Sequence, residues 1–455
     1  MKCDLLVLSA AQLITAPPGQ GPLLRDALDH PLLLSDAAVA CVDGRVAAVG
    51  KTSDVVARYP EREAGTVVDA GGCLVAPGFV DCHTHLPFAG TREMEFEARA
   101  RGETYASIAE KGGGIRASMR HLRATSEEAL TAAVQSRLNH LLSQGTTTVE
   151  AKSGYGLSLE EELKQLRAIR RAAEGATVEV IPTFLGAHEF PDEYRDRREQ
   201  YVALLTETMI PAVASEHLAR YCDVFCDKGV YTVEEARSIL TRGRELGLQP
   251  KIHADELADV GAAALAAEIH AVSADHLLHA SEEGLKAMAE ASVIAVLLPG
   301  TAFTLGLPYA RARRMVELGL AVAIASDWNP GSTMSSSLAL MMTMAVTQMR
   351  LSPGEAWMAA TANAACAVGE GARLGRIQPG HQADLVIHST SDFRHVSYHY
   401  GIDHVRTVVK RGGSRWIGRK AHLVPDAKPL SHCCIDNCHC CIRPSRNPKS
   451  GKERE

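Results

Sequence analysis

The stretch Ala76-Pro-Gly-Phe-Val-Asp-Cys-His83-Thr-His85 is the informative segment of this 455-residue chain. An apolar run over residues 73–79 is interrupted by Pro77-Gly78, and two histidines one residue apart follow it. In an extended strand, residues i and i+2 point to the same side, so His83 and His85 can converge on one point. Two convergent imidazoles are what a metal ion requires, although a His-x-His pair alone is weak evidence for a metal site.

The composition is typical of a soluble globular protein with a large core, because 46% of the residues are apolar and 5% are aromatic. The formal net charge of −6 argues against a nucleic-acid partner held by bulk electrostatics. No run approaches the roughly 18 apolar residues of a membrane-spanning helix. We therefore expect a cytoplasmic protein with no membrane partner.

The cysteines fall into two groups. Seven are scattered through the body of the chain without the spacing of a disulfide framework, and the other five crowd between Cys433 and Cys441. No strand or helix pattern accompanies these five cysteines. We therefore interpret residues 426–455 as a Cys-rich, disordered tail rather than a zinc site.

The two terminal segments share a strand-and-turn pattern. Residues 37–42, the turn signal Asp43-Gly44 and residues 45–50 predict a β-hairpin. The strand pattern returns at residues 383–388 and 407–410. We predict that residues 1–75 and 376–420 together form a small β-sandwich domain, into which residues 76–375 are inserted.

The inserted segment alternates between strand-like and helix-like runs. Helix starts include the capping-box patterns Thr125-x-x-Glu128 and Thr232-x-x-Glu235. Eight strands, each followed by a helix, predict a parallel (β/α)8 barrel. An open doubly wound sheet is the alternative, but it would need a Gly-rich turn after its first strand, which the sequence lacks. The predicted strands cover residues 74–81, 146–150, 178–185, 223–226, 250–252, 271–275, 293–298 and 321–326.

Potential metal ligands follow four of these strands. His83 and His85 follow the first, His253 the fifth, His276 the sixth and Asp327 the eighth. In a barrel all strand C-termini open on one face, where catalytic groups gather. Each residue alone has an ordinary interpretation, such as a helix N-cap for Asp327. Their coincidence at strand ends predicts a metal centre.

Seven short motifs point to a family. They resemble the amidohydrolase superfamily and, within it, the imidazolonepropionase family of histidine degradation, over roughly residues 1–420. The motifs are Ala76-Pro-Gly-Phe-Val-Asp-Cys-His-Thr-His-Leu, Phe88-Ala-Gly-Thr-Arg92-Glu, Glu150-Ala-Lys-Ser-Gly-Tyr155-Gly-Leu, Thr183-Phe-Leu-Gly-Ala-His188, Lys251-Ile-His-Ala-Asp-Glu256, Ser273-Ala-Asp-His276-Leu and Ala325-Ser-Asp-Trp-Asn329-Pro-Gly-Ser332.

The resemblance implies one divalent metal ion, zinc or iron, held by His83, His85, His253 and Asp327. Such an ion lowers the pKa of a bound water and supplies hydroxide, and this ligand set suits both metals. Relatives with two metals carry a bridging lysine at the end of strand four. Lys228 lies near that point, and we interpret it as a solvated lysine.

The resemblance also implies the reaction, in which water opens the cyclic amide of 4-imidazolone-5-propanoate to give N-formimidoyl-L-glutamate. Arg92 matches the position that binds the propanoate, because a guanidinium pairs bidentately with a carboxylate. Tyr105 and Tyr155 are implied to flank the ring, and His188 to contact the ring or its carbonyl. Glu256 is implied to accept a hydrogen bond from a ring N–H and to shuttle a proton.

The remaining implied roles concern the reacting water and the tail of the substrate. His276 matches the residue that orients the water and stabilises the oxyanion. Asp327 can take the proton of the water and pass it to the leaving nitrogen. The resemblance implies that Asn329, Gly331 and Ser332 contact the ring and the tail.

Alternative interpretations exist at each level. Arg92 could form a surface salt bridge, Tyr105 and Tyr155 could be packing residues, and His188 could be a core histidine. A superfamily deaminase acting on a purine, pyrimidine or related ring would share every metal ligand, but a neutral base needs no carboxylate-binding arginine. A metal-free scaffold of the same fold is a second alternative, although all four expected ligands are present. The resemblance implies a small-molecule substrate and a homodimer.

Overall fold

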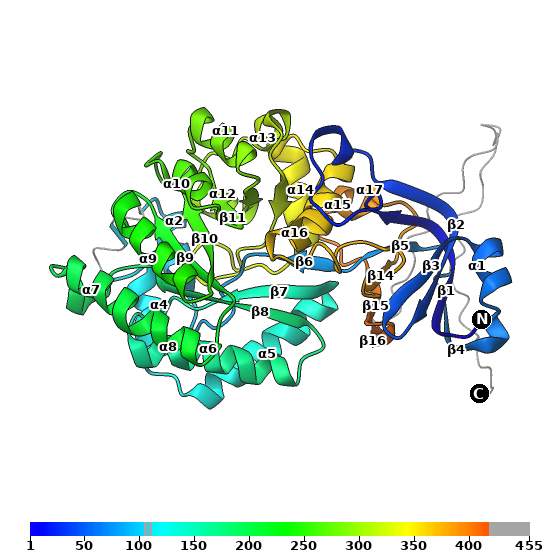
Figure 1. Ribbon diagram of the computed structural model, residues 1–455, viewed down its shortest axis with the longest axis horizontal. Helices are drawn as coiled ribbons and strands as arrows, with labels where there is room; N and C mark the ends of the chain where they lie inside the picture. The colour runs from blue at the N-terminus through cyan, green and yellow to red at the C-terminus, as the bar shows by residue number, and fades with distance from the viewer. Residues whose placement is uncertain (104–106, 109–111, 418–455) are drawn as a thin grey trace, which may run out of the picture. The chain divides into compact units, whose positions relative to one another are not determined.

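A computed structural model describes residues 1–103, 107–108 and 112–417 (Figure 1). Tyr105 and the predicted tail at 426–455 therefore lie outside the described residues. Within the described ranges, no helix is long and apolar enough to cross a membrane.

One of the two sheets is a parallel barrel sheet whose strands follow one another in sequence order. Each neighbouring pair runs parallel, and helices lie outside the strands (Figure 1). The predicted (β/α)8 barrel is therefore confirmed. The strands are β6 (Phe79–Asp81), β7 (Thr146–Lys152), β8 (Glu179–Ala187), β9 (Tyr221–Cys226), β10 (Gln249–Ala254), β11 (Ser273–His276), β12 (Ile294–Leu297) and β13 (Val322–Ile324).

Side-chain and loop contacts join the two ends of this sheet. In the described chain no strand ladder connects β6 to β13. Instead the Asp81 carboxylate accepts hydrogen bonds from the backbone N–H and the hydroxyl of Ser326, at 3.0 and 2.6 Å. The backbone N–H of Asp327 donates to the carbonyl of His83 at 3.0 Å. Barrel closure thus brings the segments that carry His83 and Asp327 side by side.

The helices of the barrel region begin mostly at polar capping residues. The predicted box at Thr232 is confirmed, because its side chain and that of Glu235 both form capping bonds. The box predicted at Thr125 is wrong: Ser126 is the N-cap, and the Thr125 hydroxyl donates to His121 O in the preceding helix. The helices are α2 (Glu93–Ala100), α4 (Ile115–Arg123), α5 (Glu127–Ser143), α6 (Leu159–Glu174), α7 (Arg198–Leu204), α8 (Ile210–Ser215), α9 (Val233–Glu245), α10 (Ala262–Glu268), α11 (Glu282–Glu290), α12 (Pro299–Leu305), α13 (Ala312–Leu318), α14 (Leu338–Met349), α15 (Pro353–Ala360) and α16 (Ala362–Ala367).

The second sheet combines the N- and C-terminal segments, as predicted. Its order is β16-β15-β14-β5-β1-β2-β3, with β4 paired to β1, and the two segments meet where β14 pairs antiparallel with β5. The predicted hairpin is β2–β3, and its turn residues Asp43 and Gly44 both have the positive φ that a tight hairpin turn requires. The strands are β1 (Cys3–Thr15), β2 (Leu32–Val42), β3 (Arg45–Lys51), β4 (Ala64–Asp69), β5 (Leu74–Pro77), β14 (Leu385–His388), β15 (Val405–Lys410) and β16 (Gly413–Ile417), and the sheet is accompanied by α1 (Thr52–Arg58) and α17 (Arg394–Tyr398).

The single strand predicted over residues 74–81 is wrong, because it is divided between the two sheets. β5 belongs to the terminal sheet and β6 to the barrel, with Gly78 between them. A Cβ at Gly78 would lie 2.4 Å from the side chain of Thr147, so only glycine lets the chain pass β7 this closely. The Pro77-Gly78 break in the apolar run is therefore the crossing point between the two sheets.

Candidate metal centre and active site

The predicted ligands converge at the end of the barrel. Candidate ligand atoms of His83, His85 and Asp327 lie within 4.8 Å of one another. His253 forms one such group with His83 and His276 and another with His85 and His188. The Nε2 atoms of His83 and His85 lie 3.5 and 3.4 Å from Asp327 Oδ1. All four side chains are buried. The structure therefore brings together the four ligands that the sequence predicted.

The outer nitrogens of two of the proposed ligand imidazoles face carboxylates, and this arrangement fits a metal ion. His83 Nδ1 lies 2.6 Å from Asp275 Oδ2, and His253 Nδ1 lies 3.0 Å from Asp223 Oδ2, although the second contact is not well aligned. A carboxylate beside Nδ1 favours the tautomer that leaves the Nε2 lone pair available to a metal. Among the described residues, Nε2 of both histidines and Asp327 Oδ1 have no hydrogen-bond partner. Buried polar atoms without partners at ligand positions are suited to a divalent ion.

The electrostatics of the centre favour the metal-binding protonation states. Burial lowers the pKa of His83 and His85, which keeps these imidazoles neutral. Burial acts to raise the pKa of Asp327, but its contacts with His85 and His276 prevail and lower it, which keeps this carboxylate ionised. Thr301 Oγ1 also donates to Asp327 Oδ2 at 2.5 Å.

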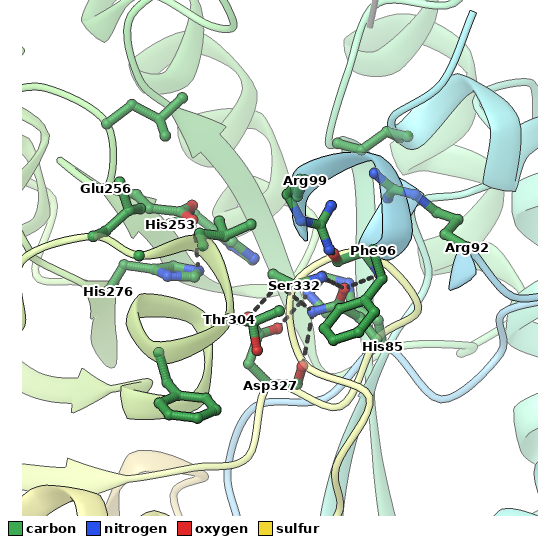
Figure 2. A pocket seen from close by; sticks show the side chains of 18 of the residues that line it. His85, Arg92, Phe96, Arg99, His253, Glu256, His276, Thr304, Asp327 and Ser332 are labelled. Carbon is green, nitrogen blue, oxygen red and sulfur yellow. Dashed lines mark hydrogen bonds and ion pairs between the residues drawn. The ribbon is translucent and has the colours of Figure 1, made fainter. Parts of the chain in front are cut away.

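Beside this centre lies a cavity of about 550 Å³, a volume suited to a small organic substrate. Figure 2 shows Arg92 and Arg99 on one side of the cavity, and His253, Glu256 and His276 on the other. His83 does not line it, and Tyr105 lies outside the described residues. The remaining predicted site residues all line this cavity: His85, Arg92, Tyr155, His188, His253, Glu256, His276, Asp327, Asn329, Gly331 and Ser332.

Arg92 lies at the start of α2, close to the loop after β13. Its Nη2 donates to Glu95 Oε2 at 2.7 Å, and a Cβ at Gly331 would lie only 2.3 Å from its Nη1. The side chain of Asn329 holds this loop, because its Oδ1 accepts from the backbone N–H of Gly331 and of Ser332, at 2.7 and 2.9 Å. Asn329 therefore helps to keep Gly331 against the guanidinium of Arg92.

Tyr155 lies in a loop that buried side chains immobilise. Gln165 Oε1 accepts from the backbone N–H of Tyr155 at 3.1 Å, and Glu162 Oε1 accepts from that of Gly156 at 2.8 Å. His188 Nδ1 lies 3.0 Å from the carbonyl of Gly154, and its ring stacks on that of His85, with centroids 5.0 Å apart. The tyrosine and the histidine thus form a rigid aromatic wall.

Glu256 and His276 form the opposite wall. Glu256 Oε2 lies 3.6 Å from His276 Nε2. Burial, and then the charges of Asp327 and Asp227, raise the pKa of Glu256 well above its ordinary value. Burial lowers the pKa of His276 to about 3, so this ring is neutral. Asp227 holds the loop, because its Oδ2 accepts from the backbone N–H of Glu256 at 2.7 Å.

Sequence reasoning missed several residues of this site. Arg99 lines the cavity, and its Nη2 donates to the carbonyl of Gly331 at 3.2 Å. It lies seven residues after Arg92 on the same helical face, so helical periodicity could have identified it. Asp223 and Asp275 were not predicted, and no local pattern marks them as partners of ligand histidines. Lys228 is exposed, as predicted.

Comparisons with known proteins agree with this geometry. A model of the amidohydrolase family matches residues 91–413, and an imidazolonepropionase-like composite domain of bacteria matches residues 37–61. The chain is 51% identical to the imidazolonepropionase of Symbiobacterium thermophilum over 413 residues, which covers 90% of this chain and 96% of the relative. It is 47% identical to that of Geobacillus thermodenitrificans, covering 90% and 97%.

Solved structures share the fold at much lower identity. E. coli guanine deaminase has a TM-score of 0.69 at 16% identity, covering 92% of this chain and all of that one. An adenosine deaminase from Xanthomonas campestris with bound zinc has a TM-score of 0.66 at 18% identity, covering 91% and 93%. These deaminases establish the architecture, whereas the close relatives establish the family. The chain therefore belongs to the imidazolonepropionase family of amidohydrolases.

Proposed function

We propose that this chain hydrolyses 4-imidazolone-5-propanoate to N-formimidoyl-L-glutamate, the third step of histidine degradation. One observation carries the proposal: two arginines line the same cavity as three of the four proposed metal ligands, His85, His253 and Asp327. The substrate has one anionic tail and one cyclic amide, so it needs a cationic subsite beside a hydrolytic centre. Deamination of a neutral base would leave these arginines without a partner on the substrate, and this favours the ring-opening reaction.

We propose that a single zinc or iron ion is held by His83, His85, His253 and Asp327. When bound, such an ion lowers the pKa of a water molecule and supplies hydroxide near neutral pH. The contacts of His83 and His253 with aspartates support this assignment, because they leave the opposite ring nitrogens available. Metal analysis of the purified protein, followed by reconstitution with Zn²⁺ or Fe²⁺, would identify the ion and its stoichiometry.

The substrate would bind with its carboxylate at Arg92 and its ring between the two walls. Arg92 pairs with the propanoate, and Gly331 and Ser332 line the same end of the cavity. Tyr155 and His188 flank the ring, while Glu256 accepts a hydrogen bond from a ring N–H. Tyr105 keeps its predicted role at the ring, although it lies outside the described residues.

Proton transfer would use three groups that line the cavity, Asp327, His276 and Glu256. Asp327 takes the proton of the attacking water and delivers it to the ring nitrogen as the amide C–N bond breaks. His276 orients the water and stabilises the charge that develops on the carbonyl oxygen. The raised pKa of Glu256 favours the protonated form of this carboxyl group, so it can take part in proton transfer.

We further propose that residues 76–375 form the catalytic domain and that residues 1–75 and 376–420 form the β domain. The change of sheet at Gly78 supports the first boundary. The homodimer and the cytoplasmic location stay predictions, which light scattering and cell fractionation would test.

The ultraviolet decay of 4-imidazolone-5-propanoate provides the test of this function. We expect metal-replete protein to accelerate the decay over a protein-free blank and to yield N-formimidoyl-L-glutamate. Protein treated with a chelator serves as the matched control, and added metal should restore its activity. If metal-replete protein leaves the decay rate unchanged, the proposed substrate is wrong, and deaminase substrates would be assayed next.

A further inference from the structure

A cluster of buried charges lies beneath the proposed metal ligands. Two lysines and three carboxylates in the barrel interior are fully buried: Lys152, Lys251, Glu150, Asp223 and Asp275. Placing an ion in such an environment costs several kcal/mol unless it is paired. The partners within this cluster are therefore informative about what the cluster does.

Lys152 contacts the two aspartates that face ligand histidines. Its Nζ lies 2.8 Å from Asp223 Oδ2 and 3.6 Å from Asp275 Oδ2. The same two oxygen atoms lie 3.0 Å from His253 Nδ1 and 2.6 Å from His83 Nδ1. One ammonium group thus contacts both oxygens that orient two ligands from opposite parts of the barrel.

The other buried lysine has different partners. Within the described residues, Lys251 Nζ pairs with Glu150 Oε2 at 2.8 Å and donates to the carbonyl of Cys82 at 3.2 Å. Lys152 also reaches Glu150, at 3.0 Å to Oε1. Glu150 therefore links the two lysines. The charge of Lys251 also stabilises the Asp275 carboxylate, but of these two lysines only Lys152 lies within ion-pair distance of both aspartates.

We propose that Lys152 is a positioning residue for the metal centre, which holds Asp223 and Asp275 as paired anions so that they orient His253 and His83. The inference rests on the proposed ligand set. Two buried carboxylates close to one cation repel each other once that cation is removed. Asp275 Oδ1 would keep the hydrogen bond from Ser273 Oγ at 2.6 Å, but the repulsion would displace the Oδ2 atoms that contact the two Nδ1 atoms. The matching Nε2 atoms would then lose their orientation toward the metal.

The surroundings of Lys152 exclude the role of a carboxylated, metal-bridging lysine. A carboxylated lysine, which bridges two metals in some relatives, carries a negative charge. The Nζ of Lys152 is surrounded instead by the carboxylate oxygens of Glu150, Asp223 and Asp275. These carboxylates would repel a carbamate and stabilise an ammonium group.

The variant Lys152→Met removes the charge and keeps the length of the side chain. Lys410→Met is the matched control, because Lys410 is also buried and lies 2.7 Å from Asp384 Oδ2 and 3.6 Å from Glu179 Oε2, away from the metal ligands. The Zn²⁺ dissociation constant is measured by competition with a chromophoric chelator, and the Co²⁺-substituted forms are compared by visible absorption. Thermal unfolding of both variants reports their loss of stability.

We expect both variants to lose stability, but only Lys152→Met to bind Zn²⁺ about 10- to 100-fold more weakly and to shift the Co²⁺ spectrum. If its affinity falls less than about fivefold relative to Lys410→Met, the positioning role is wrong. Should Lys152→Met not fold, Lys152→Gln, which removes the charge but keeps hydrogen-bond donors and leaves both aspartates in place, is judged by the same threshold. Wild-type turnover of 4-imidazolone-5-propanoate is measured separately, so a failed substrate assignment and a failed role of Lys152 give different results.

Discussion

Replacing Gly331 with alanine would displace Arg92 without removing its charge. A Cβ at residue 331 would lie 2.3 Å from Arg92 Nη1 and 3.0 Å from its Cζ, whereas ordinary contacts begin near 3.4 Å. The loop cannot easily retreat, because Asn329 Oδ1 would lie 3.2 Å from the new methyl group. The guanidinium must therefore move by about 1 Å, and a misplacement of this size costs about 100-fold in rate. We expect kcat/KM to fall by about that factor, mainly through KM.

Initial rates from the ultraviolet decay, measured over a range of substrate concentrations, would test this prediction. Metal content and thermal stability should stay at their wild-type values. The matched control is Gly21→Ala, because a Cβ at Gly21 would meet no atom within 4 Å. A kcat/KM of Gly331→Ala within about threefold of the wild-type value would refute the placement of the substrate carboxylate at Arg92.

Three further substitutions test separate parts of the molecule. Arg92→Ala should raise KM about 10- to 150-fold at normal metal content, since a hydrogen bond to a charged group contributes about 1.5–3 kcal/mol. The control variant Arg101→Ala, at the exposed end of α2, should leave KM unchanged. Glu256→Gln should lower kcat about 100-fold or more with little loss of folding, and wild-type turnover would exclude Glu256 as the proton carrier. Burial acts to raise the pKa of Glu179, but pairing with Arg373 and then Lys410 lowers it to about 2, from about 4.3 in the unfolded chain. The depressed pKa contributes about 3 kcal/mol of stability above pH 5, and this contribution is lost as the pH falls toward 2. Urea unfolding at pH 7 should therefore show Glu179→Gln less stable than wild type by about this amount. If the difference in unfolding free energy between the two proteins does not become smaller at pH 3, this assignment is wrong.

Local patterns predicted the elements of the barrel but not where one sheet ends and the next begins. The strands and the hairpin at Asp43-Gly44 follow from apolar runs and turn residues, which act through near neighbours. The crossing at Gly78 depends on how closely Thr147 approaches it, which no local pattern contains. The N-cap of α5 lies one residue later than predicted, at Ser126, because the Thr125 hydroxyl donates a hydrogen bond to the preceding helix.

The candidate site was predictable to the extent that its chemistry is local. His83 and His85 share one strand face, so residue type and spacing identified them. Arg92 and Tyr155 were identified instead by the resemblance of their motifs to the family. The contact of Asn329 with substrate stays a prediction, and the structure adds that the hydrogen bonds of its side chain hold the loop after β13 in place. Which groups a polar side chain bonds depends on the path of the folded backbone, and the spacing of residues does not reveal it.

The sequence by itself determined the types of the candidate metal ligands, the barrel and the insertion of the barrel between two strand-rich termini. These properties depend on periodicity, turn chemistry and residues at strand ends, all of which are written locally along the chain. Only the tertiary structure decided that Lys152 lies between Asp223 and Asp275, behind His253 and His83. The reason is physical: ionic groups from four different strands can pair inside a barrel only after its closure has removed water and brought the strands together.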